Sequence, residues 1–471
     1  MESHVAEAPA SSTEYAPEGA RGPGFEQGIG LRTAVAINMT QMCGIGPFVT
    51  IPLMIAALGG PQAVFGWVVG AVLALVDGLV WAELGAAMPG AGGTYLYLRE
   101  AFQYRTGRLM PFLFVWTAMF TIPLIMSTGV IGLVEYLGYL IPGMSWAEIH
   151  AVSLAIVALV LFALWRRVTK AGAISTVLWV VALLSLLIVI VASLTHFHAS
   201  LAFTYPHHAF AFDGPFWAGL GGGLLIGIYD YLGYNTTAYM AAELKDPGRV
   251  LPRSIIYSVF GIMVAYLAMN IGVLGVVPWQ QAAKSDSIAS LVLENTWGKA
   301  AADITTVLIL LTAFGSIFAG LLGGSRVPYN AARDGLFFRP FGRLHPRHHF
   351  PHVALLVMGL ITAIGSFFSL TTVISVLLAV FVIVQAIAQV VALTVLRRRQ
   401  PGLKRPYRQW LYPIPSLLAL AGWIYVYKSS GHTPIIFSLV VLAAGIVAFL
   451  IWAKAERQWP FGPKHIHEEF A

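Results

Sequence analysis

The sequence predicts an all-α integral membrane protein with twelve transmembrane helices. Of its 471 residues, 58% are hydrophobic and only 10% are charged, whereas an average soluble domain carries about 25% charged residues. The mean hydropathy is +0.76. This small number of polar side chains is not enough to cover a chain of this length in water, so lipid is its expected solvent.

The apolar runs are long enough to form spans. A transmembrane helix needs about 20 mainly apolar residues to cross about 30 Å of hydrocarbon. Spans 9 and 10 are almost contiguous, so this pair could also be a hairpin. The twelve predicted spans are residues 31–57, 64–87, 110–140, 147–165, 172–194, 215–241, 255–277, 300–324, 352–368, 370–396, 412–428 and 434–452.

The basic residues predict the orientation. Connections after even-numbered spans hold 20 of the 28 Lys and Arg residues, whereas those after odd-numbered spans hold only Lys284, Lys299 and Lys428. Basic connections stay in the cytoplasm, so both termini are expected there. The net charge of +7 comes from these short clusters and forms no continuous basic face, which argues against nucleic-acid binding.

The ends of the chain are predicted to be cytoplasmic tails, at residues 1–30 and 453–471. The first tail is polar and lacks the basic start and apolar stretch of a signal peptide, and its composition is typical of disorder. No cofactor or metal is expected, because four histidines in one odd-numbered connection have no Cys or carboxylate cluster at ligand spacing. They are His196, His198, His207 and His208.

The first span is expected to break in its middle. Gly44, Ile45 and Gly46 are followed by Pro47, which has no N–H and disfavours a continuous helix. The helix after such a break begins with free N–H groups and a partial positive charge, which suit a carboxylate. The alternatives are a simple proline kink or glycines that allow close helix packing.

The sixth span has a second predicted break, at Tyr229–Gly233. Asp230 and Asn235 lie deep in this otherwise apolar segment. An ionisable group there costs about 3 kcal/mol on insertion scales, so it indicates a functional site. Tyr231 could face either this site or the protein interior.

The two breaks are five spans apart, which is the relation expected of two inverted five-helix repeats. We therefore expect one repeat at residues 31–195 and the other at 215–396. The last two spans, at 412–452, are additional to the repeats. No residue-level similarity between the two halves supports this assignment, which depends on the positions of the breaks alone.

Four motifs in order resemble those of amino acid–polyamine–organocation permeases, and together they run from span 1 to span 11. The sixth-span Gly-Tyr-Asn is similar to the Gly-Trp-Asn of the L-type branch. The motifs are Glu83-Leu84 with Pro89 to Tyr95; Gly233-Tyr234-Asn235 with Glu243, Pro247, Arg249, Pro252 and Arg253; Ser325-Arg326 with Ala332 to Gly335; and Leu396 to Arg398 with Pro401 and Arg405 to Tyr407.

The resemblance implies a leucine-transporter-like architecture, with a substrate bound between the two breaks. It implies that Gly44, Ile45 and Gly46 offer N–H groups to a substrate carboxylate. It also places Tyr229 as an aromatic gate and Asn235 at a polar position that tunes the site.

Three departures qualify the resemblance. Gly-Ile-Gly-Pro-Phe replaces the family's Gly-Ser-Gly-Ile-Phe, and Asp230 replaces a small residue. Asp230 could pair with an α-amino group, a substrate's basic side chain or a polyamine, or it could be protonated because of its burial. The fifth span has no basic residue, although some proton-coupled relatives carry a lysine there, which favours exchange or another proton acceptor. Cys43, the only cysteine, lies in an apolar run, so the extracellular cysteine that links L-type light chains to a heavy chain is absent. The resemblance therefore implies a protein of a bacterial inner membrane, with no disulfide-linked heavy chain.

Four other charged residues are candidates for gating or coupling. Asp77 lies in the middle of span 2, where a hydrogen bond or ion pair inside the bundle is the alternative interpretation. Glu83, Arg333 and Asp334 lie near cytoplasmic ends, where a structural or gating salt bridge is expected.

The sequence thus predicts a secondary active transporter of amino acids that works by alternating access. The coupled species would be a proton or a counter-substrate. A polyamine or other organic cation, bound through Asp230, is the alternative substrate. There is no P-loop for ATP-driven transport. A membrane-embedded enzyme would need a convergent set of catalytic side chains, and a channel would need a continuous polar stripe.

Overall fold

The computed structural model describes residues 28–89, 93–165, 171–207, 209–348 and 350–461. These residues form helices and one isolated β-bridge, between Ile29 and Leu244. Several predictions fall outside them: most of both tails, the motif residues 90–92, and the basic residues Arg166, Arg167 and Lys170.

A helix occupies each of the twelve predicted spans. The first predicted span is divided into two helices, and the tenth contains a π-helical segment, η4. These elements are α1 (Leu31–Met42), α2 (Gly46–Leu58), α3 (Val64–Ala87), α5 (Leu109–Leu140), α6 (Trp146–Leu164), α7 (Ala171–Thr195), α9 (Gly214–Tyr231), α11 (Pro247–Val276), α14 (Lys299–Gly324), α16 (His352–Gly365), α17 (Leu370–Phe381), η4 (Val382–Ile387), α18 (Ala388–Arg399), α19 (Ile414–Ser429) and α20 (His432–Ala455).

Among the described residues, seven helices are long and apolar enough to cross a membrane. The number rises to eight if the bent pair α1 and α2 is counted as one span. Shorter apolar helices are Val180–Thr195, within α7, and α16 (His352–Gly365). The chain is therefore an all-helical membrane protein. Twelve full crossings and the inverted repeat remain predictions.

Shorter helices lie in the connections. Ser369 caps α17 by accepting a hydrogen bond from Thr372 N, so spans 9 and 10 are separate helices with a short turn between them. The connecting helices are η1 (Pro61–Ala63), α4 (Thr94–Thr106), α8 (Ala199–Ala202), α10 (Thr236–Tyr239), η2 (Ala241–Glu243), α12 (Trp279–Ala282), α13 (Ile288–Trp297), α15 (Arg326–Arg333) and η3 (Arg339–Gly342).

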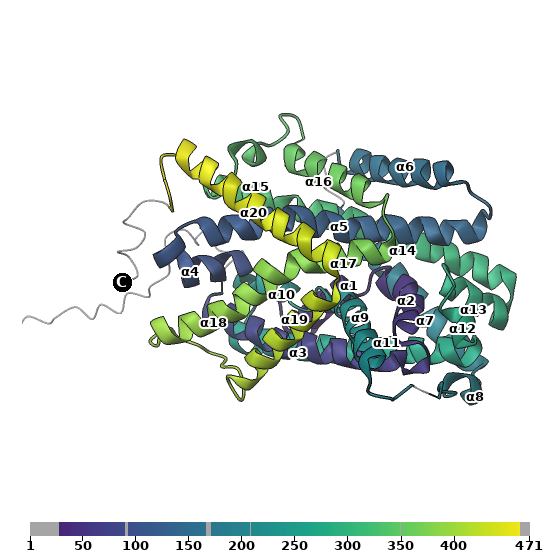
Figure 1. The fold of residues 1–471 in the computed structure, drawn as a ribbon. Helices are drawn as coiled ribbons and strands as arrows, with labels where there is room; N and C mark the ends of the chain where they lie inside the picture. The colour runs from purple at the N-terminus through teal and green to yellow at the C-terminus, as the bar shows by residue number, and fades with distance from the viewer. Residues whose placement is uncertain (1–27, 90–92, 166–170, 208, 349, 462–471) are drawn as a thin grey trace, which may run out of the picture.

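The helices pack around two long central ones. Helix α3 packs against α9, α11 and α19, and α5 packs against α14, α16, α17 and α20. Figure 1 shows α4 and the end of α18 at one end of the molecule, with α8, α12 and α13 at the opposite end. Connections predicted to be cytoplasmic and external therefore lie at opposite ends.

Glycines bring α9 directly against α3. A Cβ at Gly70 would lie 3.0 Å from the carbonyl carbon of Gly227, and a Cβ at Gly227 would lie 2.8 Å from Gly66 O. Small residues let helix backbones approach closely in membranes. This contact places the end of α9, with Asp230, beside α3.

Candidate functional site

The first break is present where the sequence predicts it. Helices α1 and α2 meet at an angle of 57° across Cys43–Ile45. Pro47 lies in the first turn of α2, where a missing N–H costs nothing because that turn has no intrahelical acceptor for it. Gly44 N donates to Met42 O at 3.1 Å. A Cβ at Gly44 would lie 3.3 Å from Ser316 Oγ of α14.

The second break lies slightly later than predicted. The expected break was Tyr229–Gly233, but α9 continues through Tyr231 and the non-helical segment is residues 232–235. The reason is Gly233, whose φ of +112° is incompatible with a right-handed helix. A Cβ there would lie 2.7 Å from Gln41 Cβ of α1, so this glycine also allows the two breaks to meet.

The helix after the second break is tied to the first span. Asn38 of α1 is fully buried, and its Oδ1 accepts a hydrogen bond from Thr237 N in α10 at 3.0 Å. Asn235 is half-buried at the start of α10, and its carbonyl accepts from Ala238 N. The side chain of Asn38 thus satisfies one of the N–H groups that α10 leaves unpaired at its start.

Asp230 lies in the last turn of α9, and its side chain contacts the start of α2. It is 3% exposed. Its Oδ2 accepts a hydrogen bond from Thr50 of α2, and a Cβ at Gly46 would lie 2.1 Å from its Oδ1. Within the described part of the chain, Oδ1 is buried and has no hydrogen-bond partner. The structure therefore brings Gly46 and Asp230 together.

Tyrosines surround this contact. The Tyr229 hydroxyl lies 2.6 Å from Thr128 Oγ1 of α5, and its Cε1 lies 3.8 Å from the Cβ position of Gly46. Tyr266 of α11 donates to Met42 O at 2.7 Å and lies 3.5 Å from Asp230 O. Tyr231 is fully buried against the Tyr266 ring.

Asp77 lies inside the bundle and accepts three hydrogen bonds. The donors are Trp81 Nε1 of α3 at 3.0 Å, Tyr234 OH in the second break at 2.5 Å and Trp423 Nε1 of α19 at 2.9 Å. These three contacts match the alternative interpretation of Asp77, a residue hydrogen-bonded inside the bundle. Its carboxyl group joins the second break to two neighbouring helices.

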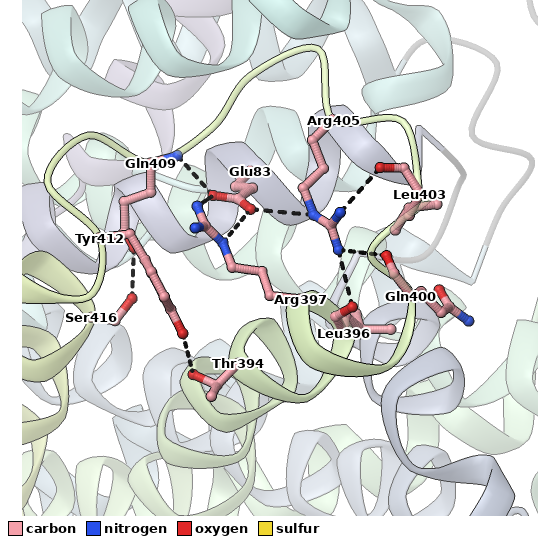
Figure 2. A network of polar contacts seen from close by, with 10 residues as sticks. All are labelled: Glu83, Thr394, Leu396, Arg397, Gln400, Leu403, Arg405, Gln409, Tyr412 and Ser416. Carbon is pink, nitrogen blue, oxygen red and sulfur yellow. Dashed lines mark hydrogen bonds and ion pairs between the residues drawn. The ribbon is translucent and has the colours of Figure 1, made fainter.

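Glu83 forms an ion pair at the end of α3, as Figure 2 shows. It is fully buried and binds Arg397 through two bonds, from Nε at 2.8 Å and from a terminal nitrogen at 2.5 Å. Arg405 Nε lies 3.5 Å away and Gln409 N donates at 2.7 Å. Because of its burial, Arg405 has a pKa below the ordinary value, which Glu83 partly offsets. The network joins α3 to the end of α18 and the connection that follows.

Arg333 and Asp334 are apart from this network. Arg333 contacts Tyr329 in its own helix, α15. Asp334 accepts a hydrogen bond from Tyr95 of α4 at 3.2 Å. Burial and this carboxylate raise the pKa of Tyr95, so its hydroxyl remains a donor. Asp334 thus joins α4 to α15.

A separate cavity of about 600 Å³ lies between connections predicted to be external. Glu135, His150 and Asp286 are among its lining residues. In the described ranges, no group of three or more His, Cys, Asp or Glu residues is placed to hold a metal ion.

Sequence reasoning missed three residues at the breaks, Thr50, Thr128 and Tyr266. Thr50 could have been found, because it lies four residues after Gly46 and therefore on the same helix face. Thr128 and Tyr266 lie in spans 3 and 7. Only packing shows that their hydroxyl groups reach the breaks.

Comparisons with known proteins identify the family of the chain. A family model described as amino acid permease matches residues 29–461. The chain belongs to the amino acid permease family. This membership confirms the predicted resemblance to the amino acid–polyamine–organocation permeases.

Individual relatives of this amino acid permease are distant but cover most of it. It is 25% identical over 450 residues to the branched-chain amino acid permease of Bacillus subtilis, covering 89% of this chain and 92% of that one. It is 25% identical over 415 residues to a serine/threonine exchanger of the same species, covering 86% and 92%. Identity to human Asc-type amino acid transporter 1 is 27% over 458 residues, covering 93% and 84%.

Proposed function

We propose that this permease is a secondary active transporter that carries amino acids across the cytoplasmic membrane of a bacterium by alternating access. The observation that carries the proposal is the meeting of two interrupted helices at Gly46 and Asp230, deep inside an apolar bundle. Unwound backbone in a membrane is tolerated where it faces a solute or is buried in protein. Discontinuous helices are the typical binding elements of secondary transporters.

The proposed substrate site comprises residues of both breaks. The backbone of the first break and the side chains of the second would contact the solute, and Tyr229 would cover it. The proposed set is Gly44, Ile45, Gly46, Tyr229, Asp230, Tyr231, Gly233 and Asn235.

The conformational change would open the site to each side in turn, with rocking of one five-helix repeat against the other. We assign the basic end of the molecule, with both termini, to the cytoplasm. Glu83 and Asp334 would then stabilise contacts on that side in one conformation. Coupling would be by exchange, as in the serine/threonine exchanger among its relatives, or by proton symport.

A polyamine or other organic cation is the second candidate substrate. It is favoured by Oδ1 of Asp230, which is buried and has no hydrogen-bond partner among the described residues, because a carboxylate in hydrocarbon needs a cationic partner.

Uptake by proteoliposomes tests the function. Vesicles containing the purified protein would be given each of the labelled amino acids in turn, with empty vesicles as the control. We expect uptake of at least one amino acid. Acceleration by unlabelled amino acid inside the vesicle would identify exchange, and acceleration by an inward proton gradient would identify symport. Absence of amino acid uptake under both conditions would refute the proposed function.

A further inference from the structure

The carboxyl group of Asp230 lies at the end of α2 that the sequence assigns to a substrate carboxylate. Its Oδ1 lies against Gly46, the first residue of α2, and its Oδ2 accepts from Thr50, one turn further on. The N-terminal end of a helix carries about half a positive charge. This end of α2 therefore already faces a carboxyl group that belongs to the protein.

The charge of this carboxylate is not balanced by the protein around it. None of the ion pairs in the described part of the chain involves Asp230. Its polar neighbours are hydroxyl groups, of which Thr50 donates to Oδ2 while Tyr229 is paired with Thr128. About half a charge at the start of α2 neutralises a full carboxylate only in part. The missing partner is a cation at Oδ1.

We propose that Asp230 Oδ1 binds the ammonium group of the substrate, so that the site recognises primary amines. This inference rests on the proposed function and concerns the same site. A substrate carboxylate next to Gly46 would face the like charge of Asp230 in a medium that screens poorly. An ammonium group offers three donors and a full positive charge to this carboxyl oxygen, which has no hydrogen-bond partner among the described residues.

The inference predicts an order of affinities for matched compounds. Leucine, 3-methylbutylamine and 4-methylpentanoate share one side chain and differ in which charged group they carry. We expect the amine to bind within about tenfold of leucine. We expect the acid, which has no ammonium group, to bind about 10- to 100-fold more weakly than the amine, as for loss of a hydrogen bond between charged groups. Lysine and 1,5-diaminopentane provide a second pair.

Binding is measured by the rise in melting temperature of the purified full chain with increasing compound. The test variant is Asp230→Asn, which keeps the size of the side chain and an acceptor for Thr50. We expect it to weaken binding of the amines and leucine by about 10- to 100-fold and to leave 4-methylpentanoate no weaker. The matched control is Asp213→Asn, the same change at the exposed start of the same helix, which should bind like the wild type.

Two results would overturn the inference. One is that 4-methylpentanoate binds the wild type as well as 3-methylbutylamine does, and this result needs no variant. The other is that Asp230→Asn binds the amines as tightly as the wild type. Amino acid transport and the ammonium site are refuted by different results. If vesicles take up no amino acid but the amines bind in an Asp230-dependent way, amino acid transport is refuted and the ammonium site stands. If amino acids are taken up but no amine binds, the ammonium site is refuted.

Discussion

Tyr234, which follows the left-handed glycine of the second break, donates its hydroxyl hydrogen to Asp77 Oδ2 over 2.5 Å. Asp77 also accepts from the indole groups of Trp81 and Trp423. A single buried carboxyl group therefore fastens the second break to α3 and α19. Any movement of the break during transport must move or break this contact.

Replacing Asp77 with Asn should destabilise the protein. An amide has one acceptor oxygen, and its NH₂ group would face donors that then lose their partner. We expect a loss of about 3 kcal/mol or more, as for other broken buried networks. The measurement is the melting temperature in detergent. Tyr234→Phe is the matched control, since it removes one of the three hydrogen bonds and should cost about 1.5–3 kcal/mol. A wild-type melting temperature for Asp77→Asn would contradict this role.

Gly46→Ala should impair the protein because of Asp230. The added methyl group would come within 2.1 Å of Asp230 Oδ1, so either the carboxyl group or α2 must shift. Combining it with Asp230→Ala removes the clash, and we expect the melting temperatures of the two single variants and the double variant to be non-additive. Gly222→Ala in α9 is the control, because a Cβ there makes an ordinary contact of 3.5 Å. Additive effects would show that Gly46 is required for another reason.

Thr128→Val should weaken substrate affinity by releasing Tyr229. The change keeps the shape of the side chain but removes the 2.6 Å contact with the Tyr229 hydroxyl. We expect the KM of uptake to rise about tenfold, which corresponds to one hydrogen bond of about 1.4 kcal/mol. Tyr229→Phe removes the same contact, so the two changes together should cost little more than either alone. Thr312→Val, whose hydroxyl bonds only within its own helix, should behave like the wild type.

Glu83→Gln should destabilise the basic end of the bundle. It leaves Arg397 and Arg405 facing each other around a neutral side chain. Removing one partner of a buried ion pair costs about 3–5 kcal/mol. We expect a loss of about 3 kcal/mol, the lower end of this range, because the Arg397 side chain is 21% exposed. Thermal unfolding in detergent measures the loss. Glu100→Gln, at a pair outside the α3–α18 contact, serves as the control and should melt like the wild type.

Much of the fold follows from hydrophobicity alone. Residues 64–87 were predicted as a span and form α3 (Val64–Ala87), because a long apolar run has no other stable conformation in lipid. Helix α11 instead begins at Pro247, eight residues before the predicted start at 255. The additional residues include Arg249, Arg253 and two prolines, and a hydropathy window cannot distinguish a helix that continues past the bilayer from a loop.

The site was predictable in outline and not in its contacts. Asp230 was identified because charge is exceptional inside an apolar span. Gly46 was identified because it precedes Pro47, and Glu83 because of its motif and its place near a cytoplasmic end. Nothing in the sequence pairs Asp230 with Thr50, or Asp77 with Tyr234 and Trp423. These residues are far apart in the chain, and their pairing depends on how helices rotate and pack.

The sequence by itself determined that this protein lies in a membrane and interrupts two helices, because hydrocarbon allows few backbone conformations and glycine and proline mark the exceptions. Only the tertiary structure decided what meets at the interruptions. The close packing of α9 against α2, where a Cβ at Gly219 would lie 2.6 Å from Ala57 O, brings Asp230 against Gly46. The broken-helix site therefore contains a carboxyl group of its own, and the chemistry of the proposed substrate follows from that contact.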